Sequence, residues 1–273
     1  MTVQEEKTRV AVAGAAGRMG RKVLETLLDT PGVTLTGALT LPEESWVGLD
    51  VGPLLGRETT GVSATGDPAR AFQDAQVVID FSSPQGLLSF LPLLREKRIP
   101  LVSGITGLEQ DHVAGLDSLA REVPVLWAPN MSLGANLLAA LARQAARRLG
   151  QGFDLEILEL HHRHKQDAPS GTALHLAQVA SQARGVDDPH VTLRPRGTIG
   201  ARGGVDEVGV GVLRGGDVVG EHTVYFFGAG ERVEIAHRVV DRTAFARGAV
   251  RAAQWLVHRP PGRYSMAHVL DLE

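Results

Sequence analysis

The chain has 273 residues, of which 43% are hydrophobic and 22% charged, and its formal net charge is -3 at pH 7. A chain of this size and composition can bury a substantial core, so a disordered chain is not expected. The lack of cysteine excludes disulfides, cysteine-ligated metals and a thiol nucleophile, and the mildly acidic balance gives no basic field for a nucleic acid, so a small-molecule partner is expected.

The first residues of the chain, 1–9, are polar and charged rather than apolar. They do not resemble a secretory signal, and no uninterrupted apolar run approaches the ~20 residues that a membrane-spanning helix needs. We therefore expect a soluble, cytoplasmic protein with neither a membrane nor a nucleic acid among its partners.

Short β-prone runs alternate with helical patterns through the first half of the chain. The first run, 9–13, ends at Gly14, and a helical pattern follows over 18–28. Strands that alternate with helices predict a parallel sheet with helices on both faces, that is, a Rossmann-like, doubly wound α/β domain. The other strands expected here are 33–39, 77–81, 100–103 and 123–127, and the other helices are a short one after Asp67-Pro68, 86–96 and 110–121.

The pattern changes after Pro129, where a long helix over 135–149 ends at Gly150. Strand-like runs follow, and the glycine-rich turns between the later ones suit antiparallel neighbours. One helix, 170–184, interrupts these runs, so the second half is expected to be an α+β domain. The runs are 154–160, 205–213, 218–227 and 232–240, and a final helix over 244–257 could pack on either domain.

Gly14, Gly17 and Gly20 form a Gly-x-x-Gly-x-x-Gly pattern where the first strand gives way to the first helix. Missing side chains at such a turn let backbone N–H groups and the helix N-terminus approach a pyrophosphate. The same glycines could instead serve only a tight turn with close helix packing. The position of the pattern, with Arg18 and Met19 inside it, favours a nucleotide site.

The densest group of reactive side chains lies within residues 159–172, just past an expected strand. Adjacent residues of a strand face opposite ways, so His161 and His162 can address one ligand only if the strand ends near them. Pro169 and the residues after it indicate that it does. Ser170 is then a plausible helix cap, with Asp167 as the alternative.

A helix that begins after Ser170 would direct the backbone N–H groups of Gly171 and Thr172 at an anion, and a carboxylate fits there. Lys165 offers a second positive charge beside it. Histidines titrate near neutral pH, so they can donate or accept a proton at this place. A proton donor beside an anion-binding helix end suggests reduction or carbonyl chemistry.

Two other interpretations of the same segment stay open. The cluster could be a solvated cationic loop, which is the commonest fate of a charge run. It could also be a metal site that uses His162 and His164, although no paired carboxylate or third ligand stands at a recognisable spacing. We expect no metal.

Two stretches of the chain resemble the 4-hydroxy-tetrahydrodipicolinate reductases. Residues 10–20 are similar to the opening of that family, and 161–173 are similar to its substrate-site signature, which is long and specific. The resemblance extends over nearly the whole chain, from Arg9 to Leu272. Shorter supporting matches are 80–82, 104–107, 128–132 and 220–223.

The resemblance implies a dinucleotide-binding domain over 1–129 and a substrate-binding and oligomerisation domain over 130–241. It implies further that the segment 242–273 returns to the first domain, and that the assembly is a homotetramer. Because substrate and nicotinamide are held by different domains in such an enzyme, closure about hinges near Pro129 and 241–242 is expected before hydride transfer.

The cofactor that the resemblance implies is NADPH or NADH. Gly14 to Met19 would hold its pyrophosphate and adenosine side, while 104–106 and 128–131 would line its nicotinamide side, where Ile105 replaces a hydroxyl residue common in the family. The full implied set of cofactor-binding residues is Gly14, Ala15, Ala16, Gly17, Arg18, Met19, Thr40, Phe81, Gly104, Ile105, Thr106, Ala128, Pro129, Asn130 and Met131.

Cofactor preference depends on the end of the second strand, where Thr40 and Leu41 replace an acidic-then-basic pair seen in many relatives. A carboxylate about 20 residues beyond the glycine loop usually bonds the ribose and repels a 2′-phosphate. Thr40 carries no repelling charge and Arg18 could reach a phosphate, so we expect NADPH to be used at least as well as NADH. Glu43 or Glu44 could instead take the missing role.

The implied substrate is a cyclic imine dicarboxylate, 4-hydroxy-tetrahydrodipicolinate, which is reduced to tetrahydrodipicolinate on the diaminopimelate route to lysine. His161 and Lys165 would be the proton donors. The residues implied to bind substrate are His162, Lys165, Ser170, Gly171 and Thr172.

Two rival functions are weighed against this one. A nucleotide-binding sensor would keep the first domain without turnover, but it has no need for a proton donor beside an anion-binding helix end. A different two-domain dehydrogenase, acting on an amino or hydroxy acid, would share the first domain and differ in the second.

Overall fold

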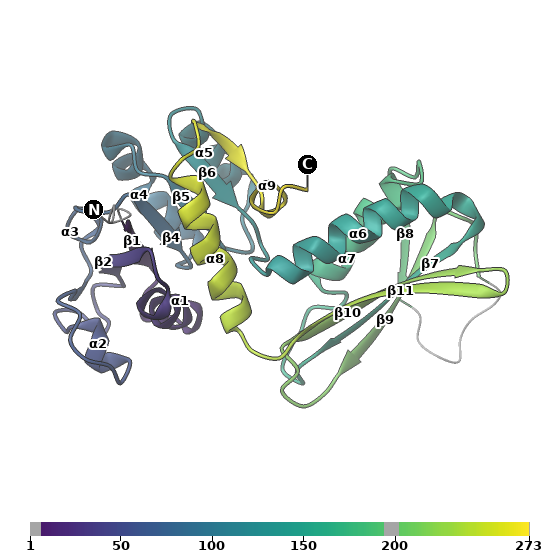
Figure 1. The fold of residues 1–273 in the computed structure, drawn as a ribbon, viewed down its shortest axis with the longest axis horizontal. Helices are drawn as coiled ribbons and strands as arrows, with labels where there is room; N and C mark the ends of the chain where they lie inside the picture. Colours follow the sequence, from purple (N-terminus) through teal and green to yellow (C-terminus); the bar gives the residue numbers. More distant parts are fainter. Residues whose placement is uncertain (1–6, 194–201, 273) are drawn as a thin grey trace, which may run out of the picture. The chain divides into compact units, whose positions relative to one another are not determined.

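The structure is a computed structural model that describes residues 7–193 and 202–272 (Figure 1). The chain forms two compact units. The first comprises the described residues up to Leu133 together with Thr243–Asp271, and the second comprises those of Gly134–Arg242. None of the helices in the described part of the chain is long and apolar enough to cross a membrane.

The first unit is built on a seven-stranded sheet in the order β12-β6-β5-β4-β1-β2-β3, and all neighbouring strands are parallel. The strand order reverses at β1, which has β2 on one side and β4 on the other. Ligands of open α/β sheets bind outside the carboxyl ends of the strands at such a reversal. The strands are β1 Thr8–Ala13, β2 Val33–Leu39, β3 Ala64–Thr65, β4 Val77–Asp80, β5 Leu101–Ser103, β6 Pro124–Trp127 and β12 Gly262–Tyr264.

Helices cover both faces of this sheet because its central strands are apolar on both sides. Val10 and Ile79 pack with helices α1 and α8, while Ala11 and Val78 pack with α4 and α5 on the opposite face. The helices of this unit are α1 Arg18–Asp29, α2 Val51–Leu54, α3 Pro68–Ala71, α4 Pro84–Lys97, α5 Gln110–Ala120, α8 Thr243–Leu256 and α9 Met266–Val269.

The second unit contains a five-stranded sheet in the order β11-β10-β7-β9-β8. One face of it is covered by α6 and α7, against which Leu155, Ile157 and Phe226 are buried. The strands are β7 Asp154–His161, β8 His190–Leu193, β9 Glu207–Arg214, β10 Gly220–Gly228 and β11 Glu231–Val239, and the helices are α6 Leu133–Leu149, α7 Gly171–Gln182 and the 3-10 turn Gly150–Gly152.

The doubly wound parallel sheet with a second α+β domain is confirmed, and the strongly periodic elements begin and end within a few residues of their expected positions. The elements that the sequence analysis missed are short: α2, β3, β8, β12 and α9. Two or three strand residues carry too little periodicity to be recognised, and β12 forms because its backbone finds β6 through space.

One expectation for the second sheet is wrong. The turn at Gly215-Gly216 was expected to join antiparallel neighbours, yet β10 pairs with β11 and β7, while β9 pairs in parallel with β7 and β8. The connection instead crosses the end of β7, where the Gly215 N–H donates to the His161 carbonyl (3.0 Å) and the Arg163 N–H to that of Gly216 (3.2 Å). A glycine-rich turn reverses the direction of the chain, but it does not determine which strand lies beside the one that follows.

A buried carboxylate fixes the carboxyl ends of β4 and β5. Asp80 is completely buried, and it accepts hydrogen bonds from the backbone and hydroxyl of Ser82 (2.9 and 2.7 Å) and from the Ser103 hydroxyl (3.1 Å). Burial raises the pKa of Asp80 to about 6, although the three hydrogen bonds lower it in part. None of these donors is charged, so they do not fully replace the lost water.

Asp80→Asn should stabilise the protein at neutral pH but not at low pH. A carboxyl whose pKa is raised to about 6 in the folded state supports folding below pH 4, and this contribution is lost as the pH rises to about 6. A shift of about two pKa units corresponds to about 3 kcal/mol. Denaturant unfolding of both proteins at pH 4 and pH 7 measures the difference, and a pH-independent difference would contradict the assignment.

Candidate functional site

The glycine loop follows β1 at the point where the strand order reverses. Gly14 has a φ of +76°, and a Cβ there would stand 2.5 Å from the Phe81 carbonyl oxygen, so only glycine fits. Gly17 is the N-cap of α1 and offers no side-chain cap. The first N–H groups of a helix have no acceptor within it, and here no side chain of the cap replaces one. The start of α1 is therefore suited to an anion.

The other expected cofactor residues of the first unit lie at the same edge of the sheet, after β4, β5 and β6. Gly104 packs against the Phe81 ring, and the Trp127 indole N–H donates to the Ile105 carbonyl (2.9 Å). The side chains of Ile105, Ala128 and Met131 are buried in the core, while Thr106 and Pro129 are exposed. The buried residues could contact a ligand only through their backbones.

Thr40 directly follows β2, but its side chain is only 8% exposed. Its backbone N–H donates to the Thr65 carbonyl (3.0 Å), which ties this position to the end of β3. Leu41, by contrast, is 56% exposed and Arg18 is exposed at the start of α1. A ligand that approached this edge would therefore meet Leu41 and Arg18 more readily than the Thr40 hydroxyl.

The histidine segment belongs to the second unit, and β7 ends at His161. His161 is buried beside His222, with the two rings edge to face and their centroids 5.1 Å apart. Its Nδ1 lies 3.7 Å from the Glu159 carboxylate and has no hydrogen-bond partner. His162, just past the strand, is half-buried, and its Nδ1 also lacks a partner, whereas His164 is exposed.

The cations of this segment are held by carboxylate and carbonyl oxygens. Lys165 forms an ion pair with Asp167 (2.7 Å), and the Lys165 side chain is 21% exposed. Arg214, at the end of β9, donates to the Asp167 carbonyl (2.7 Å) and to the Glu159 carboxylate (2.9 Å). The loop after β7 is therefore fixed by these contacts rather than being a freely solvated cationic run.

Ser170, and not Asp167, caps the helix that follows. Its hydroxyl accepts from the Ala173 N–H (3.2 Å), and its own backbone N–H donates to Glu159 (3.1 Å). Gly171, the first residue of α7, is exposed, and Thr172 follows it. The start of α7 and the end of β7 therefore share the Glu159 carboxylate.

Glu159 lies at the centre of this arrangement, with no exposed side-chain surface. Burial by itself would raise its pKa, but the contact with His222 (3.7 Å) and the hydrogen bonds from Ser170 and Arg214, together with nearby His161, outweigh burial and lower the pKa to about 2. The pKa of His161 is lowered to about 4, chiefly because the ring is buried; Glu159 opposes that shift, while His222, Lys165 and Arg214 add to it.

The sequence analysis missed Glu159, Arg214 and His222 as members of this site. Residues 159 and 161 are two apart on one strand, so strand alternation alone could have placed Glu159 on the face of His161. His222 and Arg214 come from other strands and carried no such signal. In the described part of the chain, ligand atoms of Glu159, His161 and His222 lie within 4.8 Å of one another, and neither His162 nor His164 belongs to this group.

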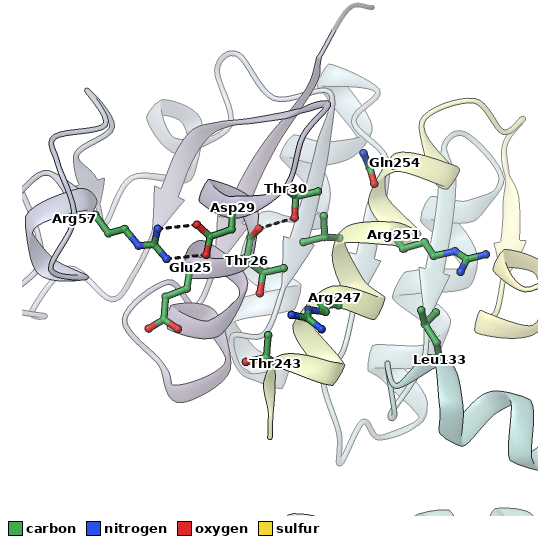
Figure 2. A pocket seen from close by; sticks show the side chains of 11 residues that line it. Glu25, Thr26, Asp29, Thr30, Arg57, Leu133, Thr243, Arg247, Arg251 and Gln254 are labelled. Atoms are coloured by element: carbon green, nitrogen blue, oxygen red, sulfur yellow. Dashed lines mark hydrogen bonds and ion pairs between the residues drawn. The ribbon is translucent and has the colours of Figure 1, made fainter. Parts of the chain in front are cut away.

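A separate hollow of about 510 Å³ lies within the first unit between α1 and α8 (Figure 2). Arg57 forms a two-point ion pair with Asp29 there (2.7 Å for each contact), and Arg247 and Arg251 of α8 line it as well. None of the site residues expected from the sequence lines it. Its α1 residues come from the second half of that helix, away from the glycine loop.

Two family descriptions match the chain one after the other. The family model described as "Dihydrodipicolinate reductase, N-terminus" matches residues 8–131. The model described as "Dihydrodipicolinate reductase, C-terminus" matches residues 134–270. Together they cover both units of the structure.

Individual relatives agree with these descriptions. A protein named 4-hydroxy-tetrahydrodipicolinate reductase from Methylocella silvestris is 50% identical over 265 residues, 97% of each chain. One of the same name from Anaeromyxobacter dehalogenans is 48% identical over 97% of this chain and 98% of its own. The dipicolinate-bound dihydrodipicolinate reductase from Paenisporosarcina sp. TG-14 shares the fold, with a TM-score of 0.77 at 24% identity over 95% of this chain and 97% of that one. This chain belongs to the dihydrodipicolinate reductase family.

Proposed function

We propose that the protein is an NAD(P)H-dependent 4-hydroxy-tetrahydrodipicolinate reductase of the diaminopimelate route to lysine. The observation that carries the proposal is the meeting of β7 and α7 at one carboxylate. His161, a possible proton donor, and Ser170, the cap of α7, both adjoin Glu159 (3.7 and 3.1 Å). A proton donor therefore stands beside a helix start suited to a carboxylate.

The proposed substrate carries two carboxylates, which need positive partners. We assign them to Lys165, His162 and the first turn of α7, with Ser170, Gly171 and Thr172. Lys165 forms an ion pair with the exposed Asp167 (2.7 Å), and a substrate carboxylate could take the place of that partner. Charge-assisted hydrogen bonds of this kind are about twice as strong as neutral ones.

The proposed reaction begins when the hydroxylated ring loses water. The reduced nicotinamide, when bound, supplies the hydride that adds to the conjugated double bond. The chain itself must then protonate the resulting enamine, and His161 and Lys165 are the proposed donors. Burial lowers the pKa of His161 to about 4, and the negative charge of a bound dicarboxylate would raise it toward the working pH.

The glycine loop after β1 fits a pyrophosphate, because it leads into the N-terminus of α1, where Gly17 provides no side-chain cap. We assign the cofactor to the loop and the neighbouring strand ends: Gly14, Ala15, Ala16, Gly17, Arg18, Met19, Thr40, Phe81, Gly104, Ile105, Thr106, Ala128, Pro129, Asn130 and Met131. Because Arg18 is exposed and Leu41 is uncharged, we propose that NADPH is used at least as well as NADH. An enzyme with this cofactor and pathway would work in the cytoplasm.

We also propose a homotetramer that forms through the face of the second sheet that α6 and α7 leave uncovered. Leu160 and Leu213 are register partners there, and Leu213 is 53% exposed. Tyr225 and Phe227 stack on the same face, with ring centroids 5.6 Å apart. Apolar side chains on an exposed sheet face are typical of a subunit contact.

Wild-type protein should consume NADPH when it is supplied with the enzymatically generated cyclic imine, measured as a loss of nicotinamide absorbance. His161→Gln and Lys165→Ala should each lower kcat about a hundredfold to ten-thousandfold, because each removes a positioned acid. Binding of NADPH, measured by fluorescence, should stay nearly unchanged. His164→Gln, at an exposed neighbour, is the matched control and should keep its activity. Cofactor binding without turnover by the wild type would favour a sensor instead.

Thr40→Glu should shift the ratio of catalytic efficiencies from NADPH toward NADH, since a carboxylate at this place repels a 2′-phosphate. Thr40→Gln has the same length without the charge, so it separates the electrostatic effect from any disturbance at this buried position. Equal ratios in the two variants would place the preference elsewhere, as would a wild type that prefers NADH more than tenfold.

Light scattering should give the mass of four chains for the wild type. Leu213→Asp should lower the mass, because a charge on this apolar face would have to lose its water in the contact. Val240→Asp, at a residue that is 90% exposed just beyond β11, is the control and should remain tetrameric. A monomeric wild type would refute the proposed assembly.

A further inference from the structure

Glu159 is a fully buried carboxylate, and it has other polar neighbours besides its ion-pair partner. Its Oε1 accepts from Arg214 (2.9 Å) and its Oε2 from the Ser170 N–H (3.1 Å). Two imidazole nitrogens, His161 Nδ1 and His222 Nε2, each lie 3.7 Å from Oε2. One oxygen therefore has room for one further hydrogen bond and two histidines within reach of it.

The two histidines differ in their hydrogen-bond partners. His222 Nε2 has a second neighbour, the Ser170 hydroxyl at 3.1 Å. His161 Nδ1 is buried with no partner at all, and a buried polar atom left in this way is costly. The 3.7 Å between this atom and Glu159 is longer than a hydrogen bond, but catalytic hydrogen bonds often are long before the ligand binds.

We propose that Glu159 is a positioning residue for His161: its buried carboxylate receives the Nδ1–H of the protonated ring, orients the ring and stabilises its positive charge. This inference rests on the proposed role of His161 as a proton donor. Glu159 need not touch the substrate. Its effect on the proton transfer would pass through the imidazole, while its hydrogen bond from the Ser170 N–H holds the start of α7.

The proton balance of the step follows from this geometry. With Nδ1–H directed at Glu159, the Nε2–H bond breaks and its proton passes to the enamine, leaving a neutral His161 that still carries the Nδ1 proton. A solvent proton then restores Nε2–H. Glu159 stays ionised throughout, since its pKa of about 2 lies far below neutrality, and a carboxylate in this position serves a histidine without accepting its proton.

The groups that face His161 show why a carboxylate is needed. His222 of β10, Lys165 of the loop after β7 and Arg214 of β9 all lower the pKa of His161, and burial lowers it further. Glu159 is the group that raises it. Without that charge the pKa of His161 would be lower still, because burial, His222, Lys165 and Arg214 would act on the ring unopposed.

Glu159→Gln tests the proposal through the pH dependence of kcat. In the wild type kcat should fall as the pH rises through the pKa of the bound-state donor. Loss of the charge should move this alkaline limb at least one unit lower, which means roughly tenfold lower kcat at a pH above the limb. The KM for the imine should change much less, and a purely structural role would lower kcat equally at all pH values.

Glu156→Gln is the matched control, because Glu156 lies on the same strand and also pairs with an arginine, Arg202 (3.1 Å). The Glu156 side chain faces the other side of the sheet. The alkaline limb of kcat in Glu156→Gln should therefore stay at the wild-type pH. An unmoved limb in a folded Glu159→Gln protein would overturn the proposal. His161→Gln, assayed alongside, separates the failures: if that variant remains active, the donor assignment itself is wrong.

The loss of a buried charge partner of Arg214 could prevent Glu159→Gln from folding, in which case Glu159→Asp takes its place. The shorter side chain keeps the charge but withdraws it from His161, so the limb should move in the same direction by a smaller amount. A folded Glu159→Asp enzyme whose limb coincides with that of the wild type would overturn the proposal as well.

Discussion

A carboxylate buried at the end of a strand must be given hydrogen-bond donors, and this requirement organises both units of the protein. Asp80 ends β4 and Glu159 lies two residues before the end of β7, and neither side chain reaches water. Removing an ionised carboxylate from water is costly unless donors replace the lost solvent. The donors come from the loops and strands nearby, and the carboxylates thereby fix the segments from which the sites are built.

The two carboxylates meet this requirement in different ways. Asp80 has only hydroxyl and amide donors, and burial raises its pKa to about 6. Glu159 has Arg214 and two histidines nearby, and its pKa is lowered to about 2 although burial opposes that shift. The first carboxyl therefore changes its charge within the accessible pH range, while the second is a permanent negative charge. Only a carboxylate that stays charged at every working pH can stabilise a protonated neighbour over that whole range.

The two units also differ in the groups that they offer to a ligand. In the first unit the glycine loop leads into the N-terminus of α1, which has no side-chain cap, and this suits a pyrophosphate. The second unit carries its ionisable groups on a mixed sheet, where β7 is flanked by β9 and β10 and so receives Arg214 from one side and His222 from the other. A strand in the middle of a sheet can collect partners from both neighbours.

The sequence by itself determined the features that depend on local chemistry. Periodicity placed α1 and β2 almost to the residue, the glycine spacing identified the loop after β1, and residues 161–173 indicated the family and the cap at Ser170. Only the tertiary structure decided which strands lie beside β7, that β12 extends the first sheet, and that His222 and Arg214 join Glu159 and His161. These outcomes depend on residues 52 or more positions apart meeting in space. A local pattern states which way a side chain faces, but the partner that satisfies a buried charge is chosen by the packing of the whole unit.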